Sequence, residues 1–134
     1  MGDLTTVEGI GETYVKKLKD AGLGSTKALL EKGATPQGRK EIAEKTGISD
    51  KLILRWVNHV DLFRVKGIGG EYAELLEATG VDTVAELAQR KPENLFQKME
   101  SVNTEKKLVR KIPTQPQVAA WIEQAKSLPR VISY

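Results

Sequence analysis

The feature that most constrains this chain is a stretch of sequence that occurs twice. Residues 7–32 align without a gap on residues 65–90, a shift of 58, and eight of the 26 aligned positions are identical. The identical pairs are Val7/Val65, Gly9/Gly67, Ile10/Ile68, Gly11/Gly69, Tyr14/Tyr72, Leu18/Leu76, Gly22/Gly80 and Leu29/Leu87. Glycines and core-type residues at a fixed offset are typical of a duplicated supersecondary unit. We therefore expect two related halves, residues 1–64 and residues 65–134.

Each copy begins with a Gly-Ile-Gly turn followed by an amphipathic segment. Glycine adopts backbone angles that are closed to other residues, and the isoleucine is suited to anchor the turn in a core. The turn opens a helix, and the first N–H groups of a helix lack intrahelical acceptors and attract phosphate. Gly9–Gly11 and Gly67–Gly69 are therefore candidate anion-binding hairpins.

The remaining patterns are helical. Apolar residues recur at helical spacing, glycines and prolines punctuate the segments, and no useful length shows the alternation of a strand. The expected helices cover about 12–21, a short segment through Leu29 and Leu30, 36–46 and 50–62, then the repeat of the first helix after Gly69, a short helix capped by Thr83, and segments 92–101, 105–111 (basic) and 117–127. The chain is thus predicted to be all-α, with short helices and no significant sheet. Trp56 and Trp121 are expected in the core, and His59 on the polar side of its helix.

Composition excludes several functional classes. The 134 residues contain no Cys and one His, which leaves no disulfide and no thiolate or His-based metal site. No nucleotide-binding fingerprint and no nucleophile with a base partner is present. We expect no enzyme activity, no cofactor, no metal and no small-molecule substrate. No apolar run approaches the roughly 20 residues that span a bilayer, so no membrane partner is expected. The absence of Cys suits the reducing cytosol, so a cytoplasmic location is expected.

The order helix, Gly-hydrophobic-Gly, helix resembles the helix-hairpin-helix motif. Two such motifs joined by a short helix resemble the five-helix, SAM-like domain that occurs at the N-terminal end of recombinases and at the C-terminal end of the RNA polymerase α chain. Residues 9–60 resemble one such unit, with hairpins at Gly9–Gly11 and Gly47–Ser49. Residues 67–127 resemble a second unit, whose later hairpin is eroded at Ile112–Pro116.

The whole chain also resembles a bacterial family of uncharacterised proteins built from these tandem units. The stretches that carry this match are residues 33–39, 61–69 and 105–110. The resemblance implies a fold, and a fold alone does not imply a function.

In helix-hairpin-helix proteins the hairpin amides and a following Lys or Arg hold the phosphodiester backbone without reading sequence. The resemblance therefore implies a nucleic-acid-binding set in the first copy: Gly9, Ile10, Gly11, Thr13, Lys16, Lys17 and Lys19. In the second copy the three lysines are replaced by Glu74, Leu75 and Glu77. Residues 12–32 carry a net charge of +2, whereas residues 65–88 carry −4. Gly67, Ile68 and Gly69 are accordingly predicted to form a structural hairpin, or one that docks a basic partner.

Two functions remain open from the sequence. The first is a non-enzymatic module that contacts the backbone of DNA or RNA through the first hairpin. The second is a protein–protein interaction or scaffold module without nucleic acid, which the split charge pattern also suits. The net charge of +3 permits the first without requiring it. The basic segments Arg39-Lys40 and Lys106-Lys107 with Arg110-Lys111 are further candidate contacts.

Overall fold

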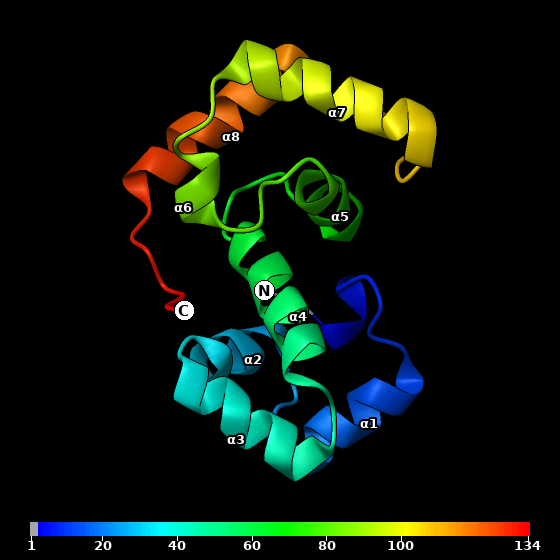
Figure 1. The fold of residues 1–134 in the computed structure, drawn as a ribbon, viewed down its shortest axis with the longest axis vertical. Helices are drawn as coiled ribbons and strands as arrows, with labels where there is room; N and C mark the ends of the chain where they lie inside the picture. Colours follow the sequence, from blue (N-terminus) through cyan, green and yellow to red (C-terminus); the bar gives the residue numbers. More distant parts are fainter. Residues whose placement is uncertain (1–2) are drawn as a thin grey trace. The chain divides into compact units, whose positions relative to one another are not determined.

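The computed structural model describes residues 3–134, and all regular secondary structure in that range is helical (Figure 1), which confirms the all-α prediction. The elements, in chain order, are the 3-10 helix η1 (Leu4–Thr6), α1 (Glu12–Asp20), α2 (Thr26–Gly33), α3 (Pro36–Thr46), α4 (Asp50–Leu62), α5 (Gly70–Ala78), α6 (Val84–Leu87), α7 (Pro92–Lys106) and α8 (Gln115–Ser127). None of these helices combines the length and apolar character needed to cross a bilayer.

The chain forms two compact units. Unit 1 contains the described residues up to Asp61 together with Val131–Tyr134, and unit 2 contains Leu62–Arg130. The sequence suggested a boundary after residue 64, with the whole C-terminal tail in the second half. In the structure the last four residues belong to unit 1.

Unit 1 brings α2 and α3 very close together. Thr35 caps α3 by accepting from the N–H of Gly38 at 3.0 Å, and Pro36 occupies the first turn of that helix. A Cβ on Gly38 would lie 1.8 Å from the carbonyl oxygen of Lys32. The Lys32 side chain also pairs with Glu41, and this contact together with one from Gln37 lowers the pKa of Glu41. The absence of a side chain at residue 38 is therefore a packing requirement.

Arg39 joins the C-terminal tail to the α2–α3 corner. The residue is 7% exposed, and its guanidinium donates to the carbonyl oxygens of Gly33 and Ser133, both at 2.8 Å. The N–H of Ser133 donates to Ala34 O at 2.8 Å, and Ile132 is buried. Burial lowers the pKa of Arg39, while Tyr134 and Asp50 act in the opposite direction. Arg39 is thus a structural residue, which argues against the candidate contact at Arg39-Lys40.

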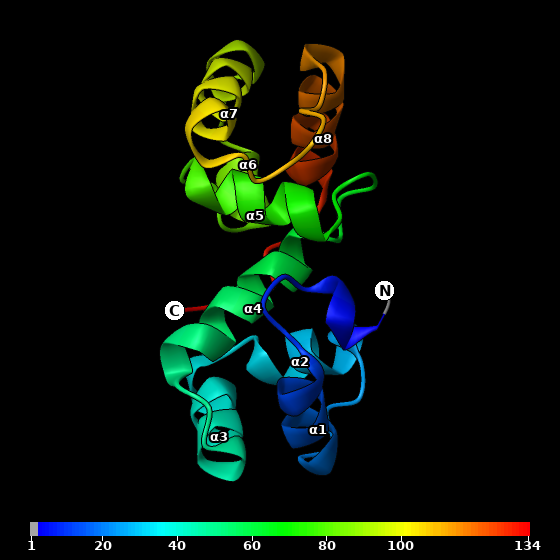
Figure 2. The same ribbon diagram turned by 90° about the vertical axis from the view of Figure 1, so that its right-hand side faces the viewer.

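Unit 2 is built on two long helices, α7 and α8, which lie side by side (Figure 2). The short helix α6 packs on α8, and α5 packs on α7. Their shared core includes Leu75, Met99 and Trp121. Arg90 closes the turn after α5 by donating to Gly80 O at 3.0 Å and to Glu86 at 3.1 Å. The central hairpin is anchored in this core through the buried Ile68.

Two predictions about individual segments are wrong. Residues 105–111 do not form a separate helix, because α7 continues to Lys106 and residues 107–114 are irregular. The chain leaves α7 through Lys107, whose φ of 51° ends the helix. His59 does not lie on a polar side, because residues 56–62 of α4 are buried on every side. Trp56 and Trp121 are buried as predicted.

The Gly38 contact gives a direct test of packing in unit 1. Gly38→Ala should lower the free energy of unfolding by about 2–3 kcal/mol, because the clash is with backbone and cannot be relieved by a rotamer change. Gly24→Ala is the matched control, since its Cβ would meet no atom within 4 Å. Urea denaturation of both variants measures the difference. Equal stabilities would contradict the packing at Gly38.

Candidate nucleic-acid interface

The first hairpin is a tight turn that positions α1. The N–H of Ile10 donates to Val7 O at 3.1 Å, and Gly9 has a φ of +95°. Val7 and Ile10 are buried, so the turn is anchored on its apolar side. Gly11 follows in an extended conformation and is exposed. The chain therefore enters α1 with its glycines toward the surface.

The N-terminus of α1 carries no side-chain cap. Gly11 occupies the cap position without a side-chain hydrogen bond, and the first helical bond runs from Val15 N to Gly11 O at 2.9 Å. The amides that precede Val15 in the first turn have no intrahelical acceptor. A Cβ on Gly11 would meet nothing within 4 Å, so the space in front of these amides is open. This arrangement suits an anionic oxygen.

Three lysines follow the hairpin on the exposed surface of α1. Lys16, Lys17 and Lys19 are all exposed on α1, and Thr13 is exposed in its first turn. Within residues 3–134 these three lysines form no ion pair. Shallow hollows lie on the surface of α1, and Lys16 lines two of them together with Glu12 and Asp20. Lysines and carboxylates are equal in number in one hollow, and Asp3 adds a third carboxylate to the other, so acidic side chains offset the lysine charge there.

The second hairpin has the same backbone conformation as the first. Gly67 has a φ of +97°, and Ile68 N donates to Val65 O at 3.2 Å. Gly69 is an uncapped N-terminus for α5, as Gly11 is for α1. The bounds of α1 and α5 also differ by 58 residues, the offset of the sequence repeat.

Each hairpin rests on a tyrosine and a tryptophan of its own unit. The ring centroids of Tyr14 and Trp56 are 4.9 Å apart, and those of Tyr72 and Trp121 are 5.3 Å apart. A Cβ on Gly9 would lie 3.5 Å from Nε1 of Trp56, and a Cβ on Gly67 would lie 3.0 Å from Nε1 of Trp121. The sequence predicted that the tryptophans are buried, but not that each indole lies under a turn glycine.

The surroundings of the two hairpins differ in charge. Glu74 and Glu77 are half-buried on α5, and Leu75 belongs to the core of unit 2. The amide of Lys66, beside the central turn, is already used, because it donates to Gln124 Oε1 at 2.9 Å. The central hairpin therefore has fewer free donors and an acidic helix behind it.

The sequence was compared with models of known protein families. A family model described as "Domain of unknown function (DUF4332)" matches residues 8–128. The chain belongs to this family. No curated protein and no solved structure gave a match. The turn glycines and tryptophans of both units lie within the DUF4332 match.

Beside the carboxylates of Glu12 and Asp20, the first hairpin offers a ligand three kinds of hydrogen-bond donor: backbone amides, the Thr13 hydroxyl and the lysine ammonium groups. A metal-binding cluster is not among them. Within residues 3–134 no three His, Cys, Asp or Glu side chains gather where a metal ion could be held. All three kinds of group at the hairpin donate hydrogen bonds, so the site is suited to an anion.

The geometry of the turns predicts an asymmetry between neighbouring glycines. Gly67→Ala should lower the free energy of unfolding by about 1–2 kcal/mol, because its φ lies in the left-handed region. Gly69→Ala should cost only about 0.5 kcal/mol, the difference between Gly and Ala at a helix cap. Thermal denaturation of the two variants provides the comparison. A larger loss at Gly69 would contradict the turn.

Proposed function

We propose that this DUF4332 chain is a non-enzymatic module that binds the phosphate backbone of DNA or RNA without reading its sequence. In this proposal each unit is a helix-hairpin-helix unit, and the first hairpin makes the contact. The residues involved are Gly9, Ile10, Gly11, Thr13, Lys16, Lys17 and Lys19. The observation that carries the proposal is the uncapped N-terminus of α1 beside three solvent-accessible lysines that form no ion pair within residues 3–134.

The chemistry of this site fits a phosphodiester. Backbone amides at a helix start donate hydrogen bonds to phosphate oxygens in any sequence context. Lysines that neutralise phosphates release condensed counterions, and binding then weakens as salt rises. The site offers no aromatic platform for bases among the described residues, since Trp56 is buried and Tyr14 is half-buried against it. Binding through the sugar-phosphate backbone is therefore favoured over base recognition.

A protein–protein scaffold is the second candidate. It is favoured by α5, where Glu74 and Glu77 present carboxylates beside a hairpin whose Lys66 amide is used internally. A basic partner would suit that surface. In this case nucleic acid would not bind, and reversing charges on α1 would leave partner binding unchanged.

Charge reversal on α1 tests the first function. Lys16→Glu/Lys19→Glu should weaken binding to a labelled DNA duplex or RNA at least about tenfold. Loss of two phosphate contacts should also reduce the slope of log K against log salt by about 1.8. Fluorescence anisotropy across a salt series measures both quantities.

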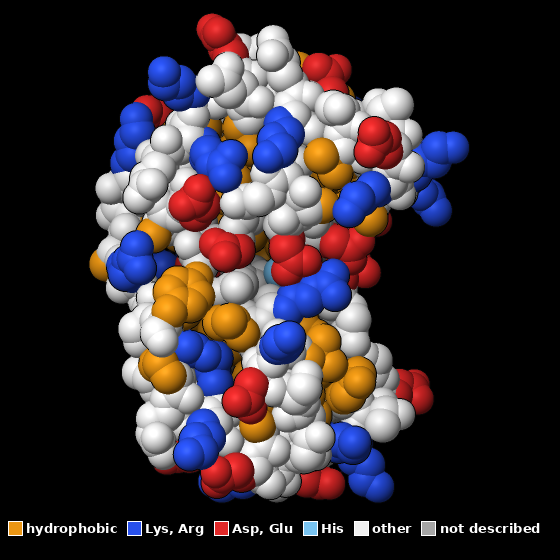
Figure 3. All heavy atoms as spheres, in the orientation of Figure 1, with side chains coloured by type: hydrophobic (Ala, Val, Ile, Leu, Met, Phe, Trp, Pro, Cys, Tyr) orange, Lys and Arg blue, Asp and Glu red, His pale blue; other side chains and the backbone are white. Residues whose placement is uncertain are grey.

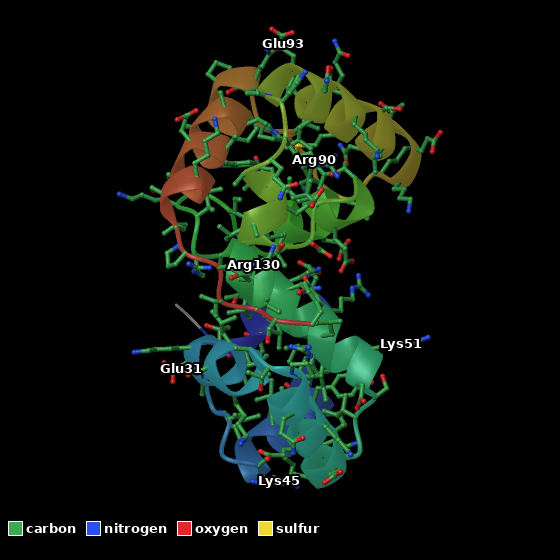
Figure 4. The ribbon with its side chains drawn as sticks, turned by 60° about the vertical axis from the view of Figure 1, so that its left-hand side comes forward. Glu31, Lys45, Lys51, Arg90, Glu93 and Arg130 are labelled. Carbon is green, nitrogen blue, oxygen red and sulfur yellow. The ribbon has the colours of Figure 1, made fainter. Side chains whose placement is uncertain are left out.

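The control for this variant must change the net charge equally at another place in unit 1. Lys45→Glu/Lys51→Glu does so on exposed residues, and Lys51 projects away from the body of unit 1 (Figure 4). The control should lose less affinity and keep its salt slope. Equal losses in both variants would point to net charge alone, and no binding by the native chain at low salt would end the proposal.

A second experiment tests the contribution of the backbone amides at the start of α1 to binding. Gly11→Ser should stabilise α1 slightly, because the serine hydroxyl caps the free N–H groups, and the same contact should displace phosphate and weaken nucleic-acid binding. Gly69→Ser is the matched change at the second hairpin, where the Cβ also meets open space. We expect it to stabilise α5 without loss of binding. Calorimetry and anisotropy on both variants give the comparison, and unchanged binding in Gly11→Ser would exclude the amides.

A further inference from the structure

We infer that unit 2 carries a second phosphate-contacting surface, formed by residues 106–111, which we call the basic loop. The ligand class, a nucleic-acid backbone, rests on the proposed function, whereas the site itself is separate from the first hairpin. Its four cations are Lys106, Lys107, Arg110 and Lys111.

The basic loop separates its charged and apolar side chains. All four cations are exposed, while Val109 is buried and Leu108 is half-buried. In the part of the chain that the structure describes, none of the four cations forms an ion pair. Figure 3 shows Lys and Arg side chains projecting near the C-terminal end of α7. The loop thus presents positive charge to solvent and uses its aliphatic residues as an anchor.

Hydrogen bonds hold the backbone of the basic loop at two points. Asn103 accepts from Val109 N at 2.9 Å through Oδ1 and donates to Val109 O at 3.1 Å through Nδ2. The hydroxyl of Tyr72 donates to Lys111 O at 3.0 Å. The backbone that carries the cations is therefore fixed before a ligand arrives, which reduces the entropy lost on binding.

Lys107 is in an unfavourable backbone conformation. Its φ is 51° and its ψ is 47°, and it is the one non-glycine residue with positive φ among residues 3–134. Helices that end in this conformation usually place glycine there, because a Cβ is penalised. A long cationic side chain at a position that favours glycine indicates that the side chain itself is used.

The helix dipole accounts for only part of this charge. Cations in the last turn of a helix are stabilised by its partial negative charge, and this effect falls off beyond that turn. It applies to Lys106 and Lys107 at the end of α7. Arg110 and Lys111 lie outside the helix, so their clustering has no such explanation.

The basic loop also contacts α5, the helix in which the lysines of α1 are replaced. Tyr72, whose hydroxyl donates to Lys111 O, is in the first turn of α5, the helix that directly follows the central hairpin. In unit 1 the cations are on α1 itself, whereas in unit 2 they come from a loop tied to the corresponding helix. Each unit thus offers phosphate contacts from a different part of its sequence.

Charge reversal in the basic loop tests the inference on the full chain. Arg110→Glu/Lys111→Glu should weaken binding to a labelled DNA duplex or its RNA counterpart about tenfold and reduce the salt slope by about 1.8. Both changes leave the Lys111 carbonyl that Tyr72 needs. Lys91→Glu/Lys126→Glu, an equal charge change on exposed residues of unit 2, should keep the salt slope.

Comparison with the α1 variant separates the outcomes. If Lys16→Glu/Lys19→Glu lowers the slope and Arg110→Glu/Lys111→Glu does not, the basic loop is excluded and the first hairpin stands. The reverse result supports the loop and excludes the first hairpin. No binding by the native chain overturns both.

Lys107→Gly separates a binding role of this side chain from a structural one, because a purely structural role would not change the salt slope. Relief of the backbone conformation should raise the melting temperature, while loss of one contact should reduce the salt slope by about 0.9. A higher melting temperature with an unchanged slope would overturn the use of Lys107 in binding.

Discussion

The structure depends on a turn glycine packed over a buried indole. Gly9 and Gly67 both have positive φ. A Cβ on Gly9 would lie 3.5 Å from a tryptophan Nε1, and a Cβ on Gly67 would lie 3.0 Å from one. Each tryptophan also contacts a tyrosine from the first turn of the helix that follows the hairpin. Glycine is needed for the backbone angle and, at Gly67, also for the close approach. The orientation of the hairpin, and of the helix that follows, is set by this contact.

Because the contact between glycine and indole involves only backbone and core, the surface side chains can differ between the two units. Lysines at 16, 17 and 19 on α1 correspond to Glu74, Leu75 and Glu77 on α5, while the bounds of the two helices keep the same offset. In unit 2 a cluster of four cations lies instead in residues 106–111, which Asn103 and Tyr72 hold in place. Two hairpins with one backbone can thus offer different surfaces to a partner.

Much of the fold could be predicted from local sequence. The bounds of α3 and α4 agree with the predicted ranges, because Thr35-Pro36 and Ser49 are local cap signals. The prediction of a helix over residues 105–111 is wrong because contacts from other helices override the local preference. Its residues favour helix, but a side chain of α7 and a tyrosine from α5 hold the segment in an irregular path. His59 was misplaced because residues 56–62 of α4 are buried on every side, so this part of the helix has no polar face for a periodic pattern to mark.

The sequence by itself determined the positions of the turn glycines, the helical periodicity and the change of charge between the copies, since each depends on residues near one another in the chain. Tertiary structure decided what lies under each glycine, which amides remain uncapped, and that Arg39 binds a residue 94 positions away. It also decided that Lys107 stands where glycine is usual. These contacts depend on the path of the chain in space, which local preference does not specify.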